Sequence, residues 1–295
     1  MLDVTSMGGQ SHHKSETDKS VRLINVMNLP LNPRVWLDLI RPLPTGRGMV
    51  IVTGMPKSGT TAIAKLLGFT TGQKVCSDPF YRLSRMKIDF RDKLFDNQLS
   101  LNTLWRRHRR VFSGTIIKDP NFVLLLPQIR KMLPDAQIVF IIRDPRDNIR
   151  SILNRLGLPG KPQDSDLDLA DLPIGWRNLI RGKSPHIPGK EYVEVLARRW
   201  RMAAEVLQRY REFCVVIRYE DFTNNKSAAI FNLAGQLGYS ELQKIDHLVD
   251  VQYQPKGDAA VLWDEFFGKT QLTIIEQVTA PLLGHFGYTT HTCDS

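Results

Sequence analysis

The stretch MVIVTGMPKSGTTAIAKLL at residues 49–67 contains the most informative motif of this chain. Residues 49–53 form a short apolar run that ends at Gly54, and an apolar helix begins in the segment 62–67. A strand, a glycine-bearing loop and a helix in this order are typical of a phosphate-binding loop. The two glycines let the backbone turn tightly, so that successive N–H groups point at one anion, and the helix directs its positive end to the same place. The stretch therefore predicts an anion-binding site between a buried strand and a buried helix.

The side chains of this loop add a charge and hydroxyl donors. Lys57 carries the charge, and Ser58, Thr60 and Thr61 carry the hydroxyls, a combination that suits a phosphate or a phosphosulfate. In loops that bind nucleoside triphosphates, a lysine directly follows the second glycine. Here Thr60 follows Gly59, and the lysine stands two residues before that glycine. The spacing therefore argues against ordinary ATP or GTP hydrolysis.

Two more apolar runs, at residues 138–142 and 214–217, indicate further buried strands. Helical segments at residues 122–132 and 192–211 precede them. Short, continuous apolar strands that alternate with helices are typical of a parallel sheet covered on both faces. We therefore predict an α/β fold with a doubly wound, mostly parallel sheet flanked by helices, similar to P-loop nucleotide-binding folds.

The strand at residues 138–142 leads to a second candidate anion site. Arg143 stands at its carboxyl edge, where open α/β sheets bind ligands, and its guanidinium fork suits a terminal phosphate. Asp144 is the expected N-cap of a following helix, in which Ser151, eight residues after the arginine, lies less than two turns from the start. The alternative is a surface network in which the arginines of this stretch pair with Asp144 and Asp147.

Both stretches resemble motifs of the sulfotransferase superfamily. Residues 56–61 match its 5′-phosphosulfate loop, P-K-S/T-G-T-T, position by position, and residues 143–151 resemble its 3′-phosphate motif, including the R-D-P-R-D core. Three further likenesses, at residues 118–120, 218–221 and 286–288, extend the resemblance to about residues 48–288. It fits the broad bacterial and Golgi-like branch better than the cytosolic phenol and steroid branch.

The resemblance implies an activity and a donor. The chain would transfer a sulfuryl group from 3′-phosphoadenosine 5′-phosphosulfate to a hydroxyl or amine of a carbohydrate, lipid-linked or small-molecule acceptor, without a metal. The implied donor-binding residues are Lys57, Ser58, Gly59, Thr60 and Thr61 at the 5′ end, Arg143 and Ser151 at the 3′-phosphate, and Tyr219 near the adenine. Lys118 would lie near the transferred group and, with Lys57, would stabilise the leaving phosphate.

The residue that takes the acceptor proton has more than one candidate. The cytosolic branch carries a histidine in a K-T-H segment, which the segment 118–120 lacks, and other branches use an acidic residue after the first helix. Asp78 stands at that place, with aspartate where glutamate is usual, so we interpret it as the general base and Asp119 as the second candidate. In the alternative interpretation, Asp78 caps a turn before the proline that follows it. His108 and His186 are further candidates that lie in no recognised motif.

The remaining segments differ in composition. Residues 1–20 are polar and predict a disordered tail, and residues 21–295 predict a single sulfotransferase domain. The segment 156–189 is rich in proline and aspartate. It is either a lid on the substrate side or a plain surface excursion.

The overall charge and the cysteines narrow the class of protein. The 40 basic and 30 acidic residues give a formal net charge of +10, which predicts an anionic partner. The basic stretch at residues 106–110 either meets an anionic acceptor or forms a solvated helix face. Three widely spaced cysteines argue against a disulfide framework and favour a reducing compartment. Because the sequence has no run of 18 apolar residues and no apolar signal segment, we expect no membrane span and a cytoplasmic location.

Two other classes of function compete with sulfuryl transfer. A nucleotide-dependent phosphotransferase with a divergent P-loop would require magnesium and a lysine in place of Thr60. A non-catalytic protein that binds nucleic acid or other anions would show affinity that falls steeply with salt, and no preference for a 3′-phosphorylated nucleotide. The paired anion motifs favour the sulfotransferase, with no nucleic acid as partner.

Overall fold

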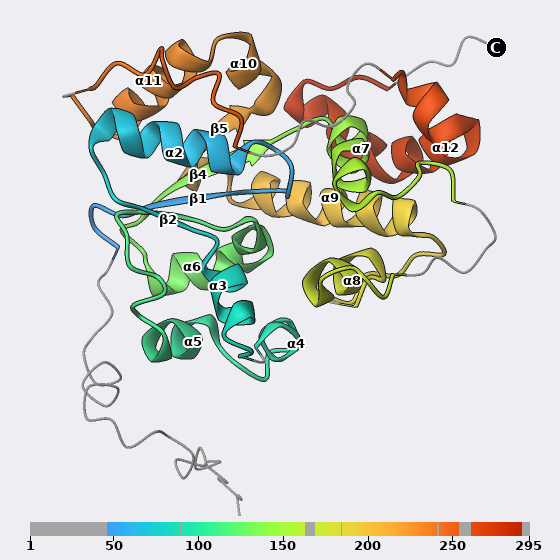
Figure 1. Cartoon of the computed structure of the whole chain (residues 1–295), viewed down its shortest axis with the longest axis horizontal. Coiled ribbons are helices and arrows are strands. Elements are labelled where there is room, and N and C mark those ends of the chain that lie inside the picture. The colour runs from blue at the N-terminus through green and yellow to red at the C-terminus, as the bar shows by residue number, and fades with distance from the viewer. Residues whose placement is uncertain are drawn as a thin grey trace, which may run out of the picture.

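A five-stranded sheet forms the centre of the protein in a computed structural model, which describes residues 46–88, 90–162, 169–183, 185–240, 242–253 and 261–290. The strand order is β2-β3-β1-β4-β5, and every pair is parallel (Figure 1). The strands are β1 (Val50–Gly54), β2 (Val75–Ser77), β3 (Ile116–Lys118), β4 (Gln137–Ile142) and β5 (Cys214–Arg218). The prediction of a doubly wound parallel sheet is thus confirmed.

Helices cover both faces of the sheet (Figure 1). On one face lie α2 (Thr60–Thr71), α10 (Tyr219–Asn224) and α11 (Lys226–Gln236). On the other lie α3 (Pro79–Arg85), α4 (Arg91–Phe95), α5 (Leu101–Arg107) and α6 (Leu126–Met132). A further group, at the right of Figure 1, consists of α7 (Pro145–Leu156), α8 (Ile174–Ile180), α9 (Tyr192–Arg209) and α12 (Trp263–Leu283).

The central strand β1 shows why these residues form a covered strand. Val50 and Val52 are fully buried and pack in one hydrophobic cluster with α2 and α11. Ile51, between them, is equally buried and belongs to a second cluster that includes α6 and part of α9. Successive side chains of a strand point to opposite faces, so a strand covered on both sides needs apolar residues at every position.

Gly54 lets β1 and β4 approach closely at their carboxyl ends. Its φ angle is +149°, and a Cβ atom there would lie 2.2 Å from the carbonyl oxygen of Ile141. Because that separation is far below a van der Waals contact, only glycine fits. The close approach brings the segments after β1 and β4 together, and these are the two segments that the sequence marks as anion-binding.

Several boundaries differ from the predictions. The segment 122–132 is a 3₁₀ turn (Pro120–Leu125) followed by α6, because Pro127 breaks the N–H pattern near its start. The segment 192–211 is helical only to Arg209, and a 3₁₀ turn follows. The three-residue strands β2 and β3 carry too little pattern to be recognised in the sequence.

The segment 156–189 contains more regular structure than expected. It includes the short helix α8 and an isolated antiparallel bridge between Lys183 and His186. The predicted tail at residues 1–20 lies outside the described residues, as do residues 163–168 and 184 of this segment. Within the residues that the structure describes, no helix combines the length and the apolar character that crossing a membrane requires.

Candidate functional site

The loop between β1 and α2 presents an uncapped helix start. Lys57 and Gly59 both adopt left-handed backbone conformations, with φ angles of +67° and +79°, and α2 begins at Thr60. Because the N-cap Gly59 has no side chain, the first-turn N–H groups of α2 receive no acceptor from a cap, and this turn contains no acidic residue. Such N–H groups at the positive end of a helix bind anions. The loop fits a phosphate on these grounds.

Asn148 on α7 holds the loop between β1 and α2 by two hydrogen bonds. Its Nδ2 donates to the carbonyl oxygen of Pro56 at 2.7 Å and to the Oγ of Ser58 at 3.0 Å. Ser58 is fully buried. Because its oxygen accepts from Asn148, its own hydroxyl proton remains available for another acceptor. The sequence did not point to this asparagine, because only the folded packing of α7 on the loop brings it there.

Arg143 joins the two predicted anion sites. Its Nη1 donates to the carbonyl oxygen of Lys57 at 2.7 Å, and its guanidinium lies 4.4 Å from the ring centre of Tyr219. The same ring lies beside Gly59, where a Cβ atom would approach it to 2.7 Å. The Nε of Arg143 is buried without a hydrogen-bond partner. The segments after β1, β4 and β5 therefore meet at one place.

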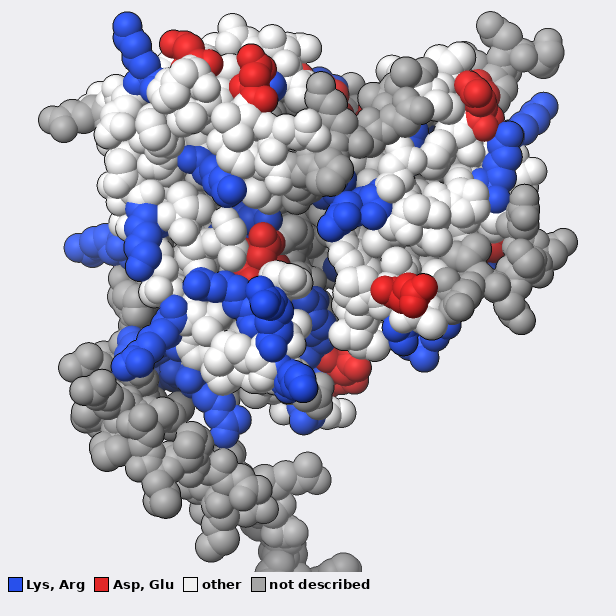
Figure 2. Space-filling model, in the orientation of Figure 1, with Lys and Arg blue, Asp and Glu red and all other residues white. Residues whose placement is uncertain are grey.

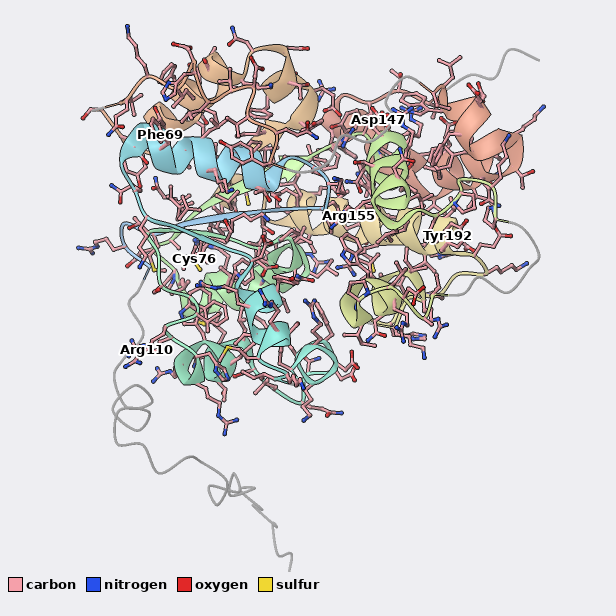
Figure 3. The ribbon with its side chains drawn as sticks, in the orientation of Figure 1. Phe69, Cys76, Arg110, Asp147, Arg155 and Tyr192 are labelled. Carbon is pink, nitrogen blue, oxygen red and sulfur yellow. The ribbon has the colours of Figure 1, made fainter. Side chains whose placement is uncertain are left out.

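Positive charge concentrates around Lys57. Burial lowers the pKa of Lys57, and the nearby charges of Arg155 and Arg143 lower it further. Arg155, labelled in Figure 3, lies on α7 four residues after Ser151, a spacing that puts both side chains on one helix face. A bound anion would relieve the repulsion among these three cations. Ser151 itself is half-buried.

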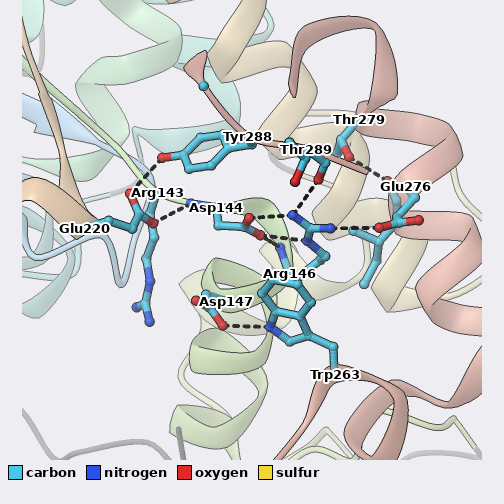
Figure 4. A network of polar contacts seen from close by, with 12 residues as sticks. Arg143, Asp144, Arg146, Asp147, Glu220, Trp263, Glu276, Thr279, Tyr288 and Thr289 are labelled. Carbon is cyan, nitrogen blue, oxygen red and sulfur yellow. Dashed lines mark hydrogen bonds and ion pairs between the residues drawn. The ribbon is translucent and has the colours of Figure 1, made fainter. Parts of the chain in front are cut away.

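A network holds the backbone of Arg143 and Asp144 (Figure 4). The Nε1 of Trp200 donates to the carbonyl oxygen of Arg143 at 2.9 Å, and the N–H of Asp144 donates to Oε1 of Glu220 at 2.9 Å. The hydroxyl of Tyr288 donates to the other oxygen of Glu220, also at 2.9 Å. Two helices, α9 and α10, and the C-terminal segment thus fix the backbone between β4 and α7, which carries the arginine.

Buried Arg146 extends this network. Its guanidinium contacts the carboxylates of Asp144 and Glu276 at 2.7 and 2.8 Å, the carbonyl oxygen of Thr289 at 2.9 Å, and the ring of Trp263 (Figure 4). The acidic partners raise the pKa of Arg146 although burial alone would lower it. The alternative of a salt-bridge network therefore describes Arg146, which pairs with Asp144, and Arg150, which pairs with Asp147, whereas Arg143 donates to the loop.

Lys118 and Asp78 form an ion pair at the ends of β3 and β2. The Nζ of Lys118 lies 2.8 and 3.0 Å from the two carboxylate oxygens of Asp78, and the N–H of Asp78 donates to the carbonyl oxygen of Lys118 at 2.7 Å. Lys118 is only 2% exposed, whereas the Asp78 side chain is 37% exposed. Asp78 precedes α3 in a left-handed conformation, and its side chain makes no cap hydrogen bond. The carboxylate therefore faces the lysine and solvent instead of the helix end.

Asp119 has a different environment from Asp78. It is buried, and its oxygens accept from the N–H of Phe80 at 2.9 Å and from both nitrogens of Asn121 at 2.9 and 2.7 Å. Burial raises the pKa of Asp119, and the negative charge of Asp78 raises it further. With its oxygens engaged in this way, Asp119 holds the turn after β3 together, which favours Asp78 over it as a base.

The other predicted residues lie apart from these contacts. His108 follows the end of α5, where burial and the charge of Arg107 lower its pKa, and His186 pairs with Lys183 in the isolated bridge. Figure 2 shows lysines and arginines gathered over the lower left of the visible face, and Figure 3 labels Arg110 at the outer edge there. Within the stretch 106–110, Arg107 and Arg110 are exposed. Among the described residues, no cluster of three potential metal ligands exists.

Comparisons with known proteins identify the class. A profile of the sulfotransferase family matches residues 73–243, more than half of the chain, so the chain belongs to the sulfotransferase family. The matched segment contains Lys118, Arg143 and Ser151, while the loop at residues 56–61 precedes it. The family does not favour the phosphotransferase alternative. No curated protein sequence matches the chain.

One of the similar solved structures agrees with the fold. The sulfotransferase STF9 from Mycobacterium avium superposes with a TM-score of 0.53 at 15% identity, over 87% of this chain and 80% of that one. The sulfotransferase STF1 from Mycobacterium tuberculosis gives a TM-score of 0.46 at 16% identity, over 85% and 79% of the two chains. At such identity, the likeness to STF9 concerns the fold alone.

Proposed function

We propose that this protein transfers a sulfuryl group from 3′-phosphoadenosine 5′-phosphosulfate to a hydroxyl or amine of a carbohydrate, lipid-linked or small-molecule acceptor. One observation carries the proposal: Nη1 of Arg143 lies 2.7 Å from the carbonyl oxygen of Lys57. The two anion-binding segments are therefore neighbours, as the two phosphate groups of one nucleotide require. Two separate anion sites, far apart, would contradict a single doubly phosphorylated ligand.

The donor-binding roles divide between the segments. In this proposal, the N–H groups and hydroxyls of Ser58, Gly59, Thr60 and Thr61 surround the 5′-phosphate, with Lys57 beside it. Arg143 and Ser151 bind the 3′-phosphate, and Tyr219 contacts the adenine. The uncapped start of α2, the buried Nε of Arg143 and the mutual repulsion of the cations near Lys57 all support an anionic occupant.

The acceptor side supplies the proton transfer. The donor contributes an activated sulfuryl group whose bond to the 5′-phosphate breaks as the acceptor atom bonds to sulfur. Asp78 is half-exposed, and we assign to its carboxylate the uptake of the acceptor proton. Neutralising Asp78 would release Lys118 from the ion pair, and its charge would then stabilise the oxygens of the transferred group. Lys57 would stabilise the leaving phosphate.

Binding of adenosine 3′,5′-bisphosphate, the expected product, tests the proposal. The bisphosphate should bind without magnesium and raise the melting temperature, because a ligand at 100 times its Kd stabilises the folded state by about 2.7 kcal/mol. Adenosine 5′-monophosphate, which lacks the 3′-phosphate, is the matched control and should bind more weakly. Binding of ATP with magnesium but not of the bisphosphate would overturn the proposal in favour of a phosphotransferase.

A further inference from the structure

Arg91, at the start of α4, is largely buried but contacts only neutral side chains among the described residues. Its Nε donates to the Oγ of Ser84 and its Nη1 to the Oδ1 of Asn121, each at 3.3 Å, and its guanidinium lies 5.4 Å from the ring centre of Phe90. All three partners are neutral, and Arg91 forms no ion pair with any described residue. Its third nitrogen, Nη2, makes no hydrogen bond to any described residue, and it is not one of the fully buried nitrogens that lack a partner.

The charge of Arg91 is incompletely compensated. Burial lowers its pKa, and the negative charges of Asp119 and Asp92 offset only part of this effect. A buried cation is normally paired with a carboxylate, because removing an unpaired charge from water is strongly unfavourable. Among the described residues, Arg91 instead leaves Nη2 without an acceptor, on the side where Gly175 presents no side chain. An anion placed there would be attracted both by the charge and by that donor.

Arg199 on α9 adds a second positive charge to the same region. It is 1% exposed, and burial together with the charge of Arg91 lowers its pKa to about 10. The charge of Arg91 on α4 therefore acts on Arg199 of α9, although about a hundred residues of sequence separate the two helices. Like charges at low dielectric repel strongly, and an anion near both would relieve this repulsion.

Arg91 lies close to the groups assigned to the acceptor. Asn121, which accepts from Arg91, also donates to Asp119, the residue after Lys118. On its other side Arg91 meets α8, where a Cβ atom on Gly175 would lie 3.5 Å from the Cζ of Arg91. In Figure 1, α4 and α8 face each other, and Figure 2 shows the surface hollowed between the parts of the molecule that carry them. Arg91 therefore lies between the turn after β3, which follows Lys118, and the segment predicted as a lid.

We propose that Arg91, supported by the charge of Arg199, binds a second, anionic group of the acceptor: a carboxylate, a phosphate or a sulfate ester. A planar guanidinium with a free donor suits the paired oxygens of such groups. Acceptors with this group would be held with one end at Arg91 and the reacting hydroxyl or amine near Asp78. The inference rests on the proposed function for the reaction, but the anion site itself does not depend on it.

Titration with inorganic sulfate tests the site directly. The protein is first saturated with adenosine 3′,5′-bisphosphate, so that the donor site is filled, and sulfate binding is then followed by calorimetry at constant ionic strength. We expect Arg91→Gln to weaken sulfate binding at least tenfold and Arg85→Gln, which removes an exposed arginine of α3, to leave it unchanged. Equal sulfate affinity in the Arg91→Gln variant and the native protein, or no sulfate binding by the loaded native protein, would overturn the proposal.

Two further arms separate the anion site from the folding role of Arg91 and from the proposed function. Gly175→Leu keeps the arginine but places a side chain over it, so sulfate affinity should fall while the bisphosphate affinity stays the same; unchanged sulfate affinity in a folded Gly175→Leu variant would contradict the site. If the bisphosphate does not bind at all, the proposed function fails. In that case, the sulfate titration is repeated on a Lys57→Ala variant, which lacks the lysine of the donor loop, and it tests the Arg91 site on its own.

Acceptor selectivity is the functional readout. 4-Nitrophenyl β-D-glucuronide carries a carboxylate where the corresponding glucoside carries a primary hydroxymethyl group. Each is offered with labelled donor, and transfer to the secondary hydroxyls that both sugars share is compared. The glucuronide should be used with the lower KM, and Arg91→Gln should remove this preference without changing the KM for the donor. A preference that survives Arg91→Gln would show that another group reads the anion and would overturn the assignment of Arg91.

Discussion

The donor side and the acceptor side of the site are held in different ways. On the donor side, hydrogen bonds from side chains fix backbone atoms: Trp200 holds the carbonyl oxygen of Arg143, and Arg143 holds that of Lys57. On the acceptor side, two charged side chains, Lys118 and Asp78, hold each other. A site fixed through backbone atoms suits a donor that is the same in every reaction. The Lys118–Asp78 pair, in contrast, can separate when an acceptor binds. The difference suggests that variants on the two sides affect different kinetic steps.

Loss of the proposed base should have the largest effect. Asp78→Asn keeps the size of the side chain but removes proton uptake, which is worth roughly 10²–10⁴-fold in rate. We expect kcat to fall by about that factor while the Kd for the bisphosphate stays the same, measured by label transfer and calorimetry. Asp135→Asn, in an exposed turn, is the charge-matched control. An unchanged kcat in the Asp78→Asn variant would show that Asp78 is not the base, and the two sides of the site would then not differ in the kinetic step they affect.

Arg143→Ala should break the donor side. A charged hydrogen bond contributes about 1.5–3 kcal/mol, so the bisphosphate should bind roughly 10- to 100-fold more weakly. Calorimetry with the bisphosphate and with adenosine 5′-monophosphate gives the measurement. The difference between these two ligands should shrink, because the arginine is assigned to the 3′-phosphate. If both ligands lose affinity equally, the arginine supports the loop and does not contact that phosphate.

Tyr288→Phe sharpens the comparison by loosening the donor scaffold without touching the ligand. It removes the hydroxyl that donates to Glu220, whose other oxygen holds the N–H of Asp144. We expect a loss of about 1 kcal/mol in the free energy of unfolding and a several-fold weaker bisphosphate affinity, with kcat at saturating donor unchanged. Tyr239→Phe is the control. Tyr288→Phe in a Glu220→Gln background should have a smaller effect, because the bond partner is already altered.

The smallest effect is a pH dependence of donor binding. Burial and the charges of Arg155 and Arg143 lower the pKa of Lys57, so this lysine loses its proton at a lower pH than an exposed one. An anion binds best to the protonated form, and affinity for the bisphosphate should therefore fall as the pH rises through this lowered pKa. Lys57→Arg should keep its affinity at alkaline pH, because arginine stays charged there. The same fall in both proteins would assign the titration to another group.

The parts that local sequence pattern determines were predictable. The strands β1, β4 and β5 are continuous apolar runs, and Asp144 caps α7 as expected, accepting from the N–H of Arg146. The strands β2 and β3, of three residues each, have too short a pattern to be recognised. The helix α8 was missed because its flanking prolines and aspartates suggest irregular structure.

The supporting residues of the site were not predictable for a different reason. Asn148, Trp200 and Glu220 act through contacts that span 57 to 92 residues of sequence. No local pattern marks such partners, since only the packing of α7, α9 and α10 around the loop brings them together. Arg91 belongs to the same class, because its significance lies in which groups are near it in space.

The tie between the C-terminal segment and the start of α7 has a practical consequence. Tyr288 and Thr289 reach back to Glu220 and Arg146, so shortening the chain at Gly287 would delete both attachments at once. Proteolytic removal of Tyr288 and Thr289 should therefore weaken nucleotide binding at a distance. A bound nucleotide should in turn slow this cleavage.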